Sequence, residues 1–311
     1  MPLDAATTAF LTEMAESGAK PIHESTPEEV RMLIAELSKL YGAGPAMARV
    51  EDHTVASSDG SFDLRVLVPE GTPRGIIIYY HGGGWVIGQI DEFDTLGRRM
   101  AQRTGCVVVL PGYRLAPEHH YPTAADDSYA ALEWVDAHKH AIAGGDVPIV
   151  LAGDSAGGNL VAVTTLRARD RNGPRIAMQV LVYPVADADV NTPSYLAPEN
   201  QLLLSRDSMI WFWDHYLPDA ARRSEPDASP LRATSLAGLP PAFVILAEHD
   251  VLRDEGEAYA ERLRVEGVPV EMQVYEGQMH AFFTLLMLPE NARAVEDACA
   301  AIEHYLVAQP A

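Results

Sequence analysis

The sequence predicts an α/β protein with a mostly parallel central sheet flanked by helices. Short apolar runs typical of strands alternate with helical segments over most of the 311 residues, and no Pro/Ser-rich linker or internal repeat interrupts them. A chain of this length can bury a sizeable core. We therefore expect one core domain, formed by residues 46–185 and 224–311.

The core elements are expected in a regular order. Residues 53–57 and 62–68 predict an antiparallel start of the sheet. Later strands are predicted near Gly75, Cys106, Pro148, Ile176, Ala242 and Val268, and helices near Asp94, Thr123, Gly158, Asp254 and Ala292. The last helix should bury an apolar stripe formed by Val295, Cys299, Ile302 and Leu306.

Two segments lie outside this alternation and are predicted to form a helical cap. Residues 1–45 hold two helices, and the second opens at residues 26–29 with a capping box and a proline at its first position. The insertion at residues 186–223 holds another helix, which is expected to begin near Ser205 and end at Pro218.

The inserted helix is rich in aromatic side chains. These rings either wall the substrate pocket or attach the cap to the core, and the sequence leaves both readings open. The side chains that we expect to border the substrate are Trp85, Leu203, Leu204, Met209 and Phe212.

A serine lies at the centre of residues 153–157, Gly-Asp-Ser-Ala-Gly. Residues 148–152 before it predict a buried strand, and residues 159–169 after it predict a helix. Ser155 is therefore expected on a sharp strand-to-helix turn, where glycines permit a strained backbone that exposes the hydroxyl. The short pattern also arises by chance in glycine-containing turns, so a catalytic role depends on this context.

A second glycine motif, His-Gly-Gly-Gly at residues 81–84, follows the predicted strand at residues 75–80. Backbone N–H groups in such a loop can point at a tetrahedral oxyanion because no side chains obstruct them. The oxyanion donors are predicted at Gly83, Gly84 and Ala156. The imidazole of His81 is expected to brace the loop. The alternative, a flexible turn of three glycines, leaves the position at a strand end unexplained.

A serine hydroxyl needs a base to take its proton, and the base needs an acid to orient it. His280 is the predicted base because it lies in a loop at residues 276–282, between a strand and the last helix. Other histidines near plausible site loops are assigned structural hydrogen bonds: His119, His120, His215 and His249.

The predicted acid is Asp250, which follows the late strand at residues 241–247. Two other carboxylates compete with it. Glu248 is expected to lie still within the strand, and Asp254 opens the next helix, where a capping role explains it more simply.

Composition limits the partners. The formal net charge of −21 and the pI near 4.8 argue against a nucleic-acid or anionic-membrane surface, since phosphates attract basic patches. The two cysteines, Cys106 and Cys299, fit small buried hydrophobes better than a disulfide framework or a metal site. Neither a basic leader nor a long apolar segment is evident, so we expect a cytoplasmic protein. A homodimer is left open.

Together the motifs resemble the hormone-sensitive-lipase-like family (bacterial family IV) of α/β-hydrolase esterases. The resemblance spans nearly the whole chain beyond about residue 40 and adds Tyr-Arg-Leu-Ala-Pro-Glu at residues 113–118 and Asp-Val-Leu-Arg-Asp at residues 250–254. One departure is Ala281, where the family often has glycine after the histidine.

The resemblance implies the α/β-hydrolase fold and a serine carboxylesterase acting on short to medium acyl esters, with no metal or organic cofactor. Ser155 would attack the carbonyl, His280 would move the proton, and Asp250 would hold the imidazole. Amides, thioesters or lactones would use the same triad and stay open as substrates. A ligand-binding receptor on this fold is disfavoured by His280, and a dehalogenase by a serine at position 155.

Overall fold

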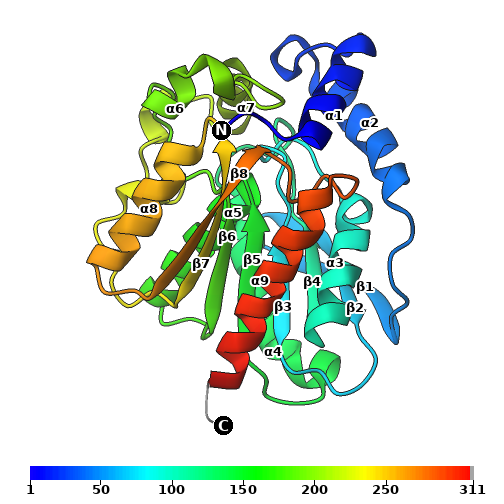
Figure 1. Cartoon of the computed structure of the whole chain (residues 1–311). Coiled ribbons are helices and arrows are strands. Elements are labelled where there is room, and N and C mark those ends of the chain that lie inside the picture. Colours follow the sequence, from blue (N-terminus) through cyan, green and yellow to red (C-terminus); the bar gives the residue numbers. More distant parts are fainter. Residues whose placement is uncertain (309–311) are drawn as a thin grey trace.

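A mixed sheet of eight strands forms the centre of the computed structural model, which describes residues 1–308 (Figure 1). The strands are β1 (Arg49–Ser57), β2 (Gly60–Val68), β3 (Ile76–Tyr80), β4 (Val107–Gly112), β5 (Ile149–Asp154), β6 (Met178–Val182), β7 (Ala242–His249) and β8 (Val270–Met279). Their order in the sheet is β1-β2-β4-β3-β5-β6-β7-β8. The β1–β2 and β2–β4 pairs are antiparallel and the other five pairs are parallel. The expected α/β-hydrolase architecture is confirmed.

Helices cover both faces of the sheet. They are α1 (Ala5–Glu16), α2 (Pro27–Ser38), α3 (Ile90–Thr104), α4 (Thr123–Ala143), α5 (Ala156–Asp170), α6 (Pro193–Leu196), α7 (Arg206–Tyr216), α8 (Arg253–Val265) and α9 (Pro289–Ala308). Ile76 and Ile78 of β3 join the core shared with α4, α5 and α8, whereas Ile77 joins the core shared with α3 and α9. Burial on both faces explains why the parallel strands are continuous apolar runs.

The two cysteines are small buried residues, as expected. Cys106 and Cys299 are free and buried in the core between the sheet and α9. Burial raises the pKa of both thiols, to about 12 for Cys299.

Among the described residues, no helix has the length and apolar character needed to cross a bilayer.

Two boundaries differ from the expectation. Strand β8 continues to Met279, so most of the predicted loop before His280 is strand. Strand β7 continues through Glu248 to His249, with an irregular register between Ala247 and His249. Positions 276–278 resemble a turn in sequence, and Gly277 does have a positive φ of 69°. The residues on either side, Tyr275 and Met279, pair with Ala247 and His249 of β7, so the strand continues past this irregularity.

Asp254 does not cap α8. The residue before the first turn is Leu252, which has no capping side chain, and the carboxylate of Asp254 accepts the backbone N–H of Ser194 at 2.8 Å. The predicted capping role is therefore wrong. Asp254 instead fastens the inserted segment to the start of α8.

The additions to the core lie over the carboxyl edge of the parallel strands, with α1 and α2 on one side and α6 and α7 on the other (Figure 1). The capping box at Thr26 and Glu29 forms in both directions, at 3.3 and 2.9 Å. Ser205 caps α7 through its side chain, as expected. That these pieces act as a substrate cap stays a prediction.

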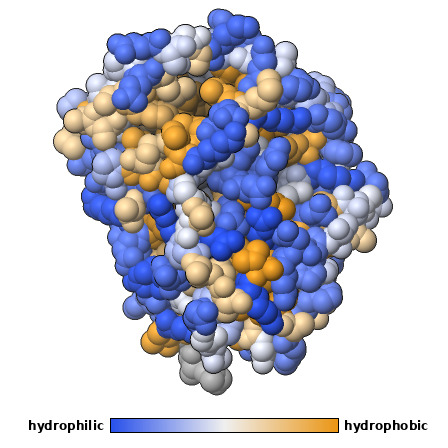
Figure 2. Space-filling view, turned by 90° about the vertical axis from the view of Figure 1, so that its right-hand side faces the viewer, coloured by the Kyte–Doolittle hydropathy of each residue, from blue (hydrophilic) through white to orange (hydrophobic). Residues whose placement is uncertain are grey.

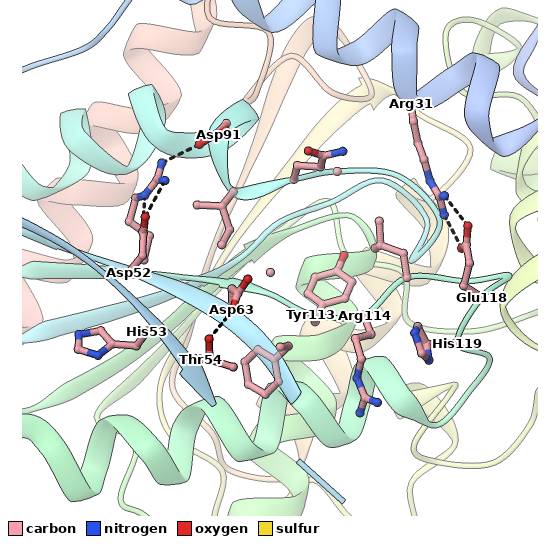
Figure 3. A pocket seen from close by; sticks show the side chains of 17 residues that line it. Arg31, Asp52, His53, Thr54, Asp63, Asp91, Tyr113, Arg114, Glu118 and His119 are labelled. Carbon is pink, nitrogen blue, oxygen red and sulfur yellow. Dashed lines mark hydrogen bonds and ion pairs between the residues drawn. The ribbon is translucent and has the colours of Figure 1, made fainter. Parts of the chain in front are cut away.

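Arg31 of α2 ties the N-terminal addition to the core. Its Nε donates to the carbonyl of Val86 and one Nη donates to that of Ala116, both at 2.8 Å. Its guanidinium also makes two bonds of 2.7 and 2.8 Å to the carboxylate of Glu118 (Figure 3). Because Val86 lies two residues after the last glycine of the motif, α2 and that loop are mechanically linked.

We expect Arg31→Ala to lower kcat/KM by about tenfold and the free energy of unfolding by about 1–3 kcal/mol, since charge-assisted bonds to two carbonyls are lost. Activity on an aryl acetate and urea unfolding would measure both. Arg103→Ala is a matched control, because this arginine pairs with Glu296 and Glu303 on α9, remote from the loop. Unchanged activity in Arg31→Ala would contradict the link.

Candidate active site

Ser155 occupies a strained turn between β5 and α5. Its backbone has φ 54° and ψ −119°, outside the helical and extended regions that most residues adopt. Its N–H donates to the carbonyl of Val182 at 2.8 Å, and its own carbonyl accepts from Asn159 and Val185 at 3.0 and 3.1 Å. These bonds hold the turn so that the side chain, in a residue 6% exposed, faces the site.

His280 and Asp250 come to the same place from the ends of β8 and β7. The Nε2 of His280 lies 3.0 Å from Oγ of Ser155, and its Nδ1 lies 2.7 Å from Oδ2 of Asp250. Asp250 is 1% exposed, and its other oxygen accepts the N–H of Leu252 at 2.9 Å. The structure thus brings the three predicted side chains into one chain of hydrogen bonds.

The two rival carboxylates do not contact His280. Glu248 accepts the N–H of Gly277 at 2.7 Å and forms an ion pair with the amino group of Met1. Asp254 is occupied by Ser194, as described above. Of the three candidate carboxylates, Asp250 is the one that is hydrogen-bonded to His280.

Three of the other histidines near the site, His120, His215 and His249, bond to the backbone through their rings. His120 and His215 donate from Nδ1 to the carbonyls of His215 and Trp211, at 2.7 and 2.8 Å. His249 donates from Nε2 to the carbonyl of Met1 at 2.7 Å. These contacts agree with structural roles for the three side chains.

His81 lies inside the glycine loop. Its Nδ1 is 2.7 Å from the carbonyl of Gly82, and its ring stacks on Tyr113 with centroids 4.2 Å apart. Burial lowers the pKa of His81 to about 4, so the imidazole is neutral near pH 7. A neutral, enclosed ring braces the loop and is not placed to exchange protons with a substrate.

The glycine loop is held in conformations that other residues resist. Gly83 and Gly84 have φ 104° and 59°, and the carbonyl of Gly83 accepts from Val86 and Ile87 at 3.0 and 2.9 Å. Within residues 1–308, the N–H groups of Gly83 and Gly84 meet no protein acceptor. The third predicted donor, Ala156, is the first residue of α5, where N–H groups are also free of helical partners.

One of the predicted pocket residues, Phe212 of α7, lies against this loop. A Cβ on Gly84 would collide with the ring of Phe212, so that ring lies against the loop. Met209, Phe212 and Leu204 are buried, and Leu203 is partly buried. Their contact with substrate stays a prediction.

Trp85 packs against the inserted helix, and its contact with substrate stays a prediction. Its indole has no exposed surface, stacks on Tyr216 with centroids 4.2 Å apart, and lies 4.8 Å from the ring of Trp213. The ring therefore attaches the loop to α7, which is the alternative role for aromatic residues of the cap.

Several contacts of the site were not visible in the sequence pattern. The ring of Tyr183 lies 4.5 Å from the imidazole of His280, and Nδ2 of Asn200 donates to the carbonyl of Asp250 at 3.2 Å. Ala281 has φ 72°, in the region where glycine is unstrained, so a non-glycine residue occupies a left-handed position directly after His280.

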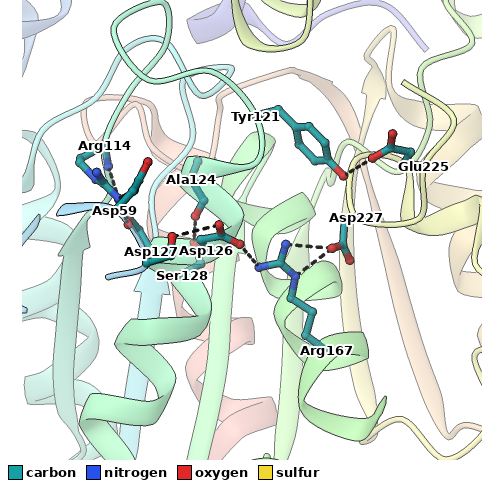
Figure 4. A network of polar contacts seen from close by, with 11 residues as sticks. Asp59, Arg114, Tyr121, Ala124, Asp126, Asp127, Ser128, Arg167, Glu225 and Asp227 are labelled. Atoms are coloured by element: carbon teal, nitrogen blue, oxygen red, sulfur yellow. Dashed lines mark hydrogen bonds and ion pairs between the residues drawn. The ribbon is translucent and has the colours of Figure 1, made fainter. Parts of the chain in front are cut away.

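A polar network fixes the segment that returns from the insertion (Figure 4). The buried guanidinium of Arg167 on α5 bonds to Asp126 of α4 and to Asp227, both at 2.8 Å. Tyr121 donates to Glu225 at 2.8 Å nearby. The network therefore joins the returning segment to the two helices behind Ser155.

A surface depression of about 800 Å³ lies elsewhere, beside β1, β2 and the start of α3 (Figure 3). None of the predicted site residues lines it. Its arginines are already paired: Arg31 with Glu118, and Arg65 with Asp52, Asp91 and Asp94. No group of three or more His, Cys, Asp or Glu side chains suited to a metal ion occurs in the described residues.

Comparison with known proteins agrees with the fold. A family model described as the alpha/beta hydrolase fold matches residues 77–284. Carboxylesterase NlhH of Mycobacterium tuberculosis is 39% identical over 268 residues, 83% of each chain. Ethyl acetate hydrolase of Pseudomonas putida is 33% identical over 300 residues, 93% of this chain and 94% of that protein.

The solved structures agree as well. A hyperthermophilic esterase from the archaeon Pyrobaculum calidifontis superposes with a TM-score of 0.93 at 37% identity, over 99% of this chain and 100% of that one. The fold and the site define an α/β-hydrolase. Within that class, the chain belongs to the hormone-sensitive-lipase-like family and is a carboxylic ester hydrolase.

We expect Gly84→Ala to lower kcat/KM by about a hundredfold, because the new methyl group meets Phe212 and displaces backbone donors in the loop. Steady-state kinetics on an aryl acetate would measure the loss. Gly71→Ala is a matched control, since Gly71 also has positive φ, 88°, but has no atom within 4 Å of the added carbon. Equal activity in the two variants would argue against a role for the glycine loop in catalysis.

Proposed function

We propose that this ester hydrolase works through an acyl-enzyme on Ser155. The hydroxyl oxygen attacks the ester carbonyl while His280 takes the proton at Nε2, and Asp250 stabilises the imidazolium through Nδ1. The imidazolium then gives the proton to the departing alcohol. Water repeats the sequence on the acyl-enzyme, with His280 again as base, and releases the carboxylic acid.

The hydrogen-bonded chain of Ser155, His280 and Asp250 is the observation that carries this proposal. The acid holds the imidazole with Nδ1 protonated, which leaves Nε2 free to accept the serine proton. Enclosure strengthens the electrostatic interactions among these groups, since Ser155 and His280 are only 6% and 8% exposed.

We propose further that the tetrahedral oxyanion binds the backbone N–H groups of Gly83, Gly84 and Ala156. Two of these amides have no protein acceptor in the described residues, and the third lies at the positive end of α5. Such donors stabilise charge that develops only in the transition state, which raises kcat.

Esters with small acyl groups are the proposed substrates. Phe212 lies against Gly84 of the oxyanion loop, and further buried apolar side chains of the insertion lie nearby in the chain. Relatives named ethyl acetate hydrolase and arylesterase, each 33% identical over most of this chain, support the same class. A panel of acetyl, butyryl, octanoyl and decanoyl esters, with matching amides and lactones, would test it. Faster turnover of amides, lactones or decanoyl esters would overturn this choice.

We expect Ser155→Ala to reduce kcat at least about ten-thousandfold with the fold intact, because no other side chain replaces the nucleophile. Mass spectrometry after treatment with a serine-directed phosphonate should find the adduct on residue 155 of the parent. Exposed Ser58→Ala is the control and should keep parental turnover. Labelling of a different residue would refute the assignment.

The acid is tested by comparing three variants. We expect Asp250→Asn to lower kcat by about 10³–10⁴-fold, because the amide favours the wrong imidazole tautomer. Glu248→Gln and Asp254→Asn should stay within about threefold of the parent, since neither side chain contacts His280. A larger loss in either of them would move the acid role away from Asp250.

A further inference from the structure

The carboxylate of Asp154 is buried between the serine turn and the glycine loop. This residue is 4% exposed and directly precedes Ser155. Its Oδ1 accepts two hydrogen bonds, from the N–H of Gly82 at 2.9 Å and from the hydroxyl of Tyr79 at 2.8 Å. The triad does not use this carboxylate.

These bonds join two parts of the site that come from neighbouring strands. Strands β3 and β5 are paired in parallel, with Tyr80 opposite Gly153. Asp154 therefore stands one residue before the nucleophile, and its partner Gly82 stands one residue before the predicted donor Gly83. The hydrogen bond between Asp154 and Gly82 therefore links Ser155, which would attack the carbonyl carbon, to Gly83, which would bind the carbonyl oxygen.

Gly82 packs tightly against the side chain of Asp154. A Cβ on Gly82 would collide with Oδ2 of Asp154 and would lie 3.1 Å from its backbone carbonyl. The loop is thus pressed against the carboxylate on one side. On its other side, the carbonyl of Val86 is held by Arg31.

Burying this charge costs stability. Burial raises the pKa of Asp154 to about 6, while the bonds from Tyr79 and Gly82 and the nearby His280 oppose the rise. The titratable groups that face it are Tyr79 from β3, Tyr113 after β4, Tyr183 after β6 and His280 after β8. All four tyrosine and histidine side chains are themselves buried. A neutral residue would avoid this cost, so stability alone does not explain the carboxylate.

We propose that Asp154 is a positioning residue whose ionised side chain holds the loop that carries Gly83 and Gly84 at the correct distance from Ser155. The inference rests on the proposed function, because it assigns the oxyanion to that loop. A charge-assisted bond to Gly82 is shorter and stronger than a neutral one, and small displacements of transition-state donors are costly.

The test compares Asp154→Asn, which is nearly isosteric and neutral, with Asp154→Ala, which removes the acceptor. We expect kcat on an aryl acetate to fall by about tenfold in the first and about a hundredfold in the second, with KM within about twofold. A loss confined to kcat indicates a transition-state contact. Parental kcat in Asp154→Ala would overturn the proposal.

Stability provides the second readout. The folded-state pKa lies above the ordinary value of 3.8, so this group costs stability that grows as pH rises from that value through about 6. At pH 8, Asp154→Asn should therefore melt at the same temperature as the parent or higher, although it is slower. A lower melting temperature together with a matched loss of activity would show a merely structural role.

The pH profile adds a third readout. As pH falls through about 6, Asp154 gains a proton and its bond to Gly82 weakens, so part of the parent's loss of kcat/KM on the acid side should come from Asp154. In Asp154→Asn this part of the loss should be missing. An unchanged acid limb would contradict the inference.

Asp127→Asn is the matched control, because Asp127 is also fully buried but bonds to Arg114 (Figure 4). This variant should lose stability and keep parental kcat. Ser155→Ala, measured in parallel, separates the two hypotheses. If Ser155→Ala is inactive and Asp154→Ala is normal, only the inference fails, whereas an active Ser155→Ala removes the proposed function itself.

Discussion

The close approach of α5 to the end of β3 sets the geometry of the whole site. A Cβ on Gly157 would collide with the carbonyl of Tyr80 and lie 2.6 Å from that of His81, and a Cβ on Gly153 would lie 2.6 Å from Gly157. Backbone therefore packs on backbone, which only glycine permits. This contact places the start of α5, the strained turn at Ser155 and the glycine loop side by side, so nucleophile and backbone donors derive their spacing from one interface.

The additions to the core depend on the same loop. Arg31 from α2 holds the carbonyl of Val86, and Tyr216 from α7 stacks on Trp85 two residues after Gly83. The two pieces are far apart in sequence, yet both end on residues 83–86. A shift of either piece is therefore transmitted to the loop that carries the N–H groups of Gly83 and Gly84.

The sequence predicted the fold and the three convergent side chains well because both follow from local patterns. Apolar runs marked the strands, and parallel strands bring their carboxyl ends to one edge, where Ser155, Asp250 and His280 all lie. Local patterns gave wrong predictions where contacts between residues far apart in the sequence determine the structure. Asp254 resembled a helix cap but binds Ser194. Positions 276–279 resembled a loop but belong to β8, which pairs with β7 on both sides of Gly277. The partner of Asp154 is Gly82, 72 positions earlier, so no spacing rule could assign its role.

The buried state of Cys106 and Cys299 has a practical consequence. Both thiols are buried in the core between the sheet and α9, and burial keeps them protonated at neutral pH, whereas thiol reagents attack the exposed thiolate. A single cysteine introduced on the outer face of α2, for example at the exposed Met32, would then be the one readily alkylated site in the folded molecule. A fluorophore could be attached there without first removing the native sulfur atoms, which makes movement of this helix during turnover directly observable by spectroscopy.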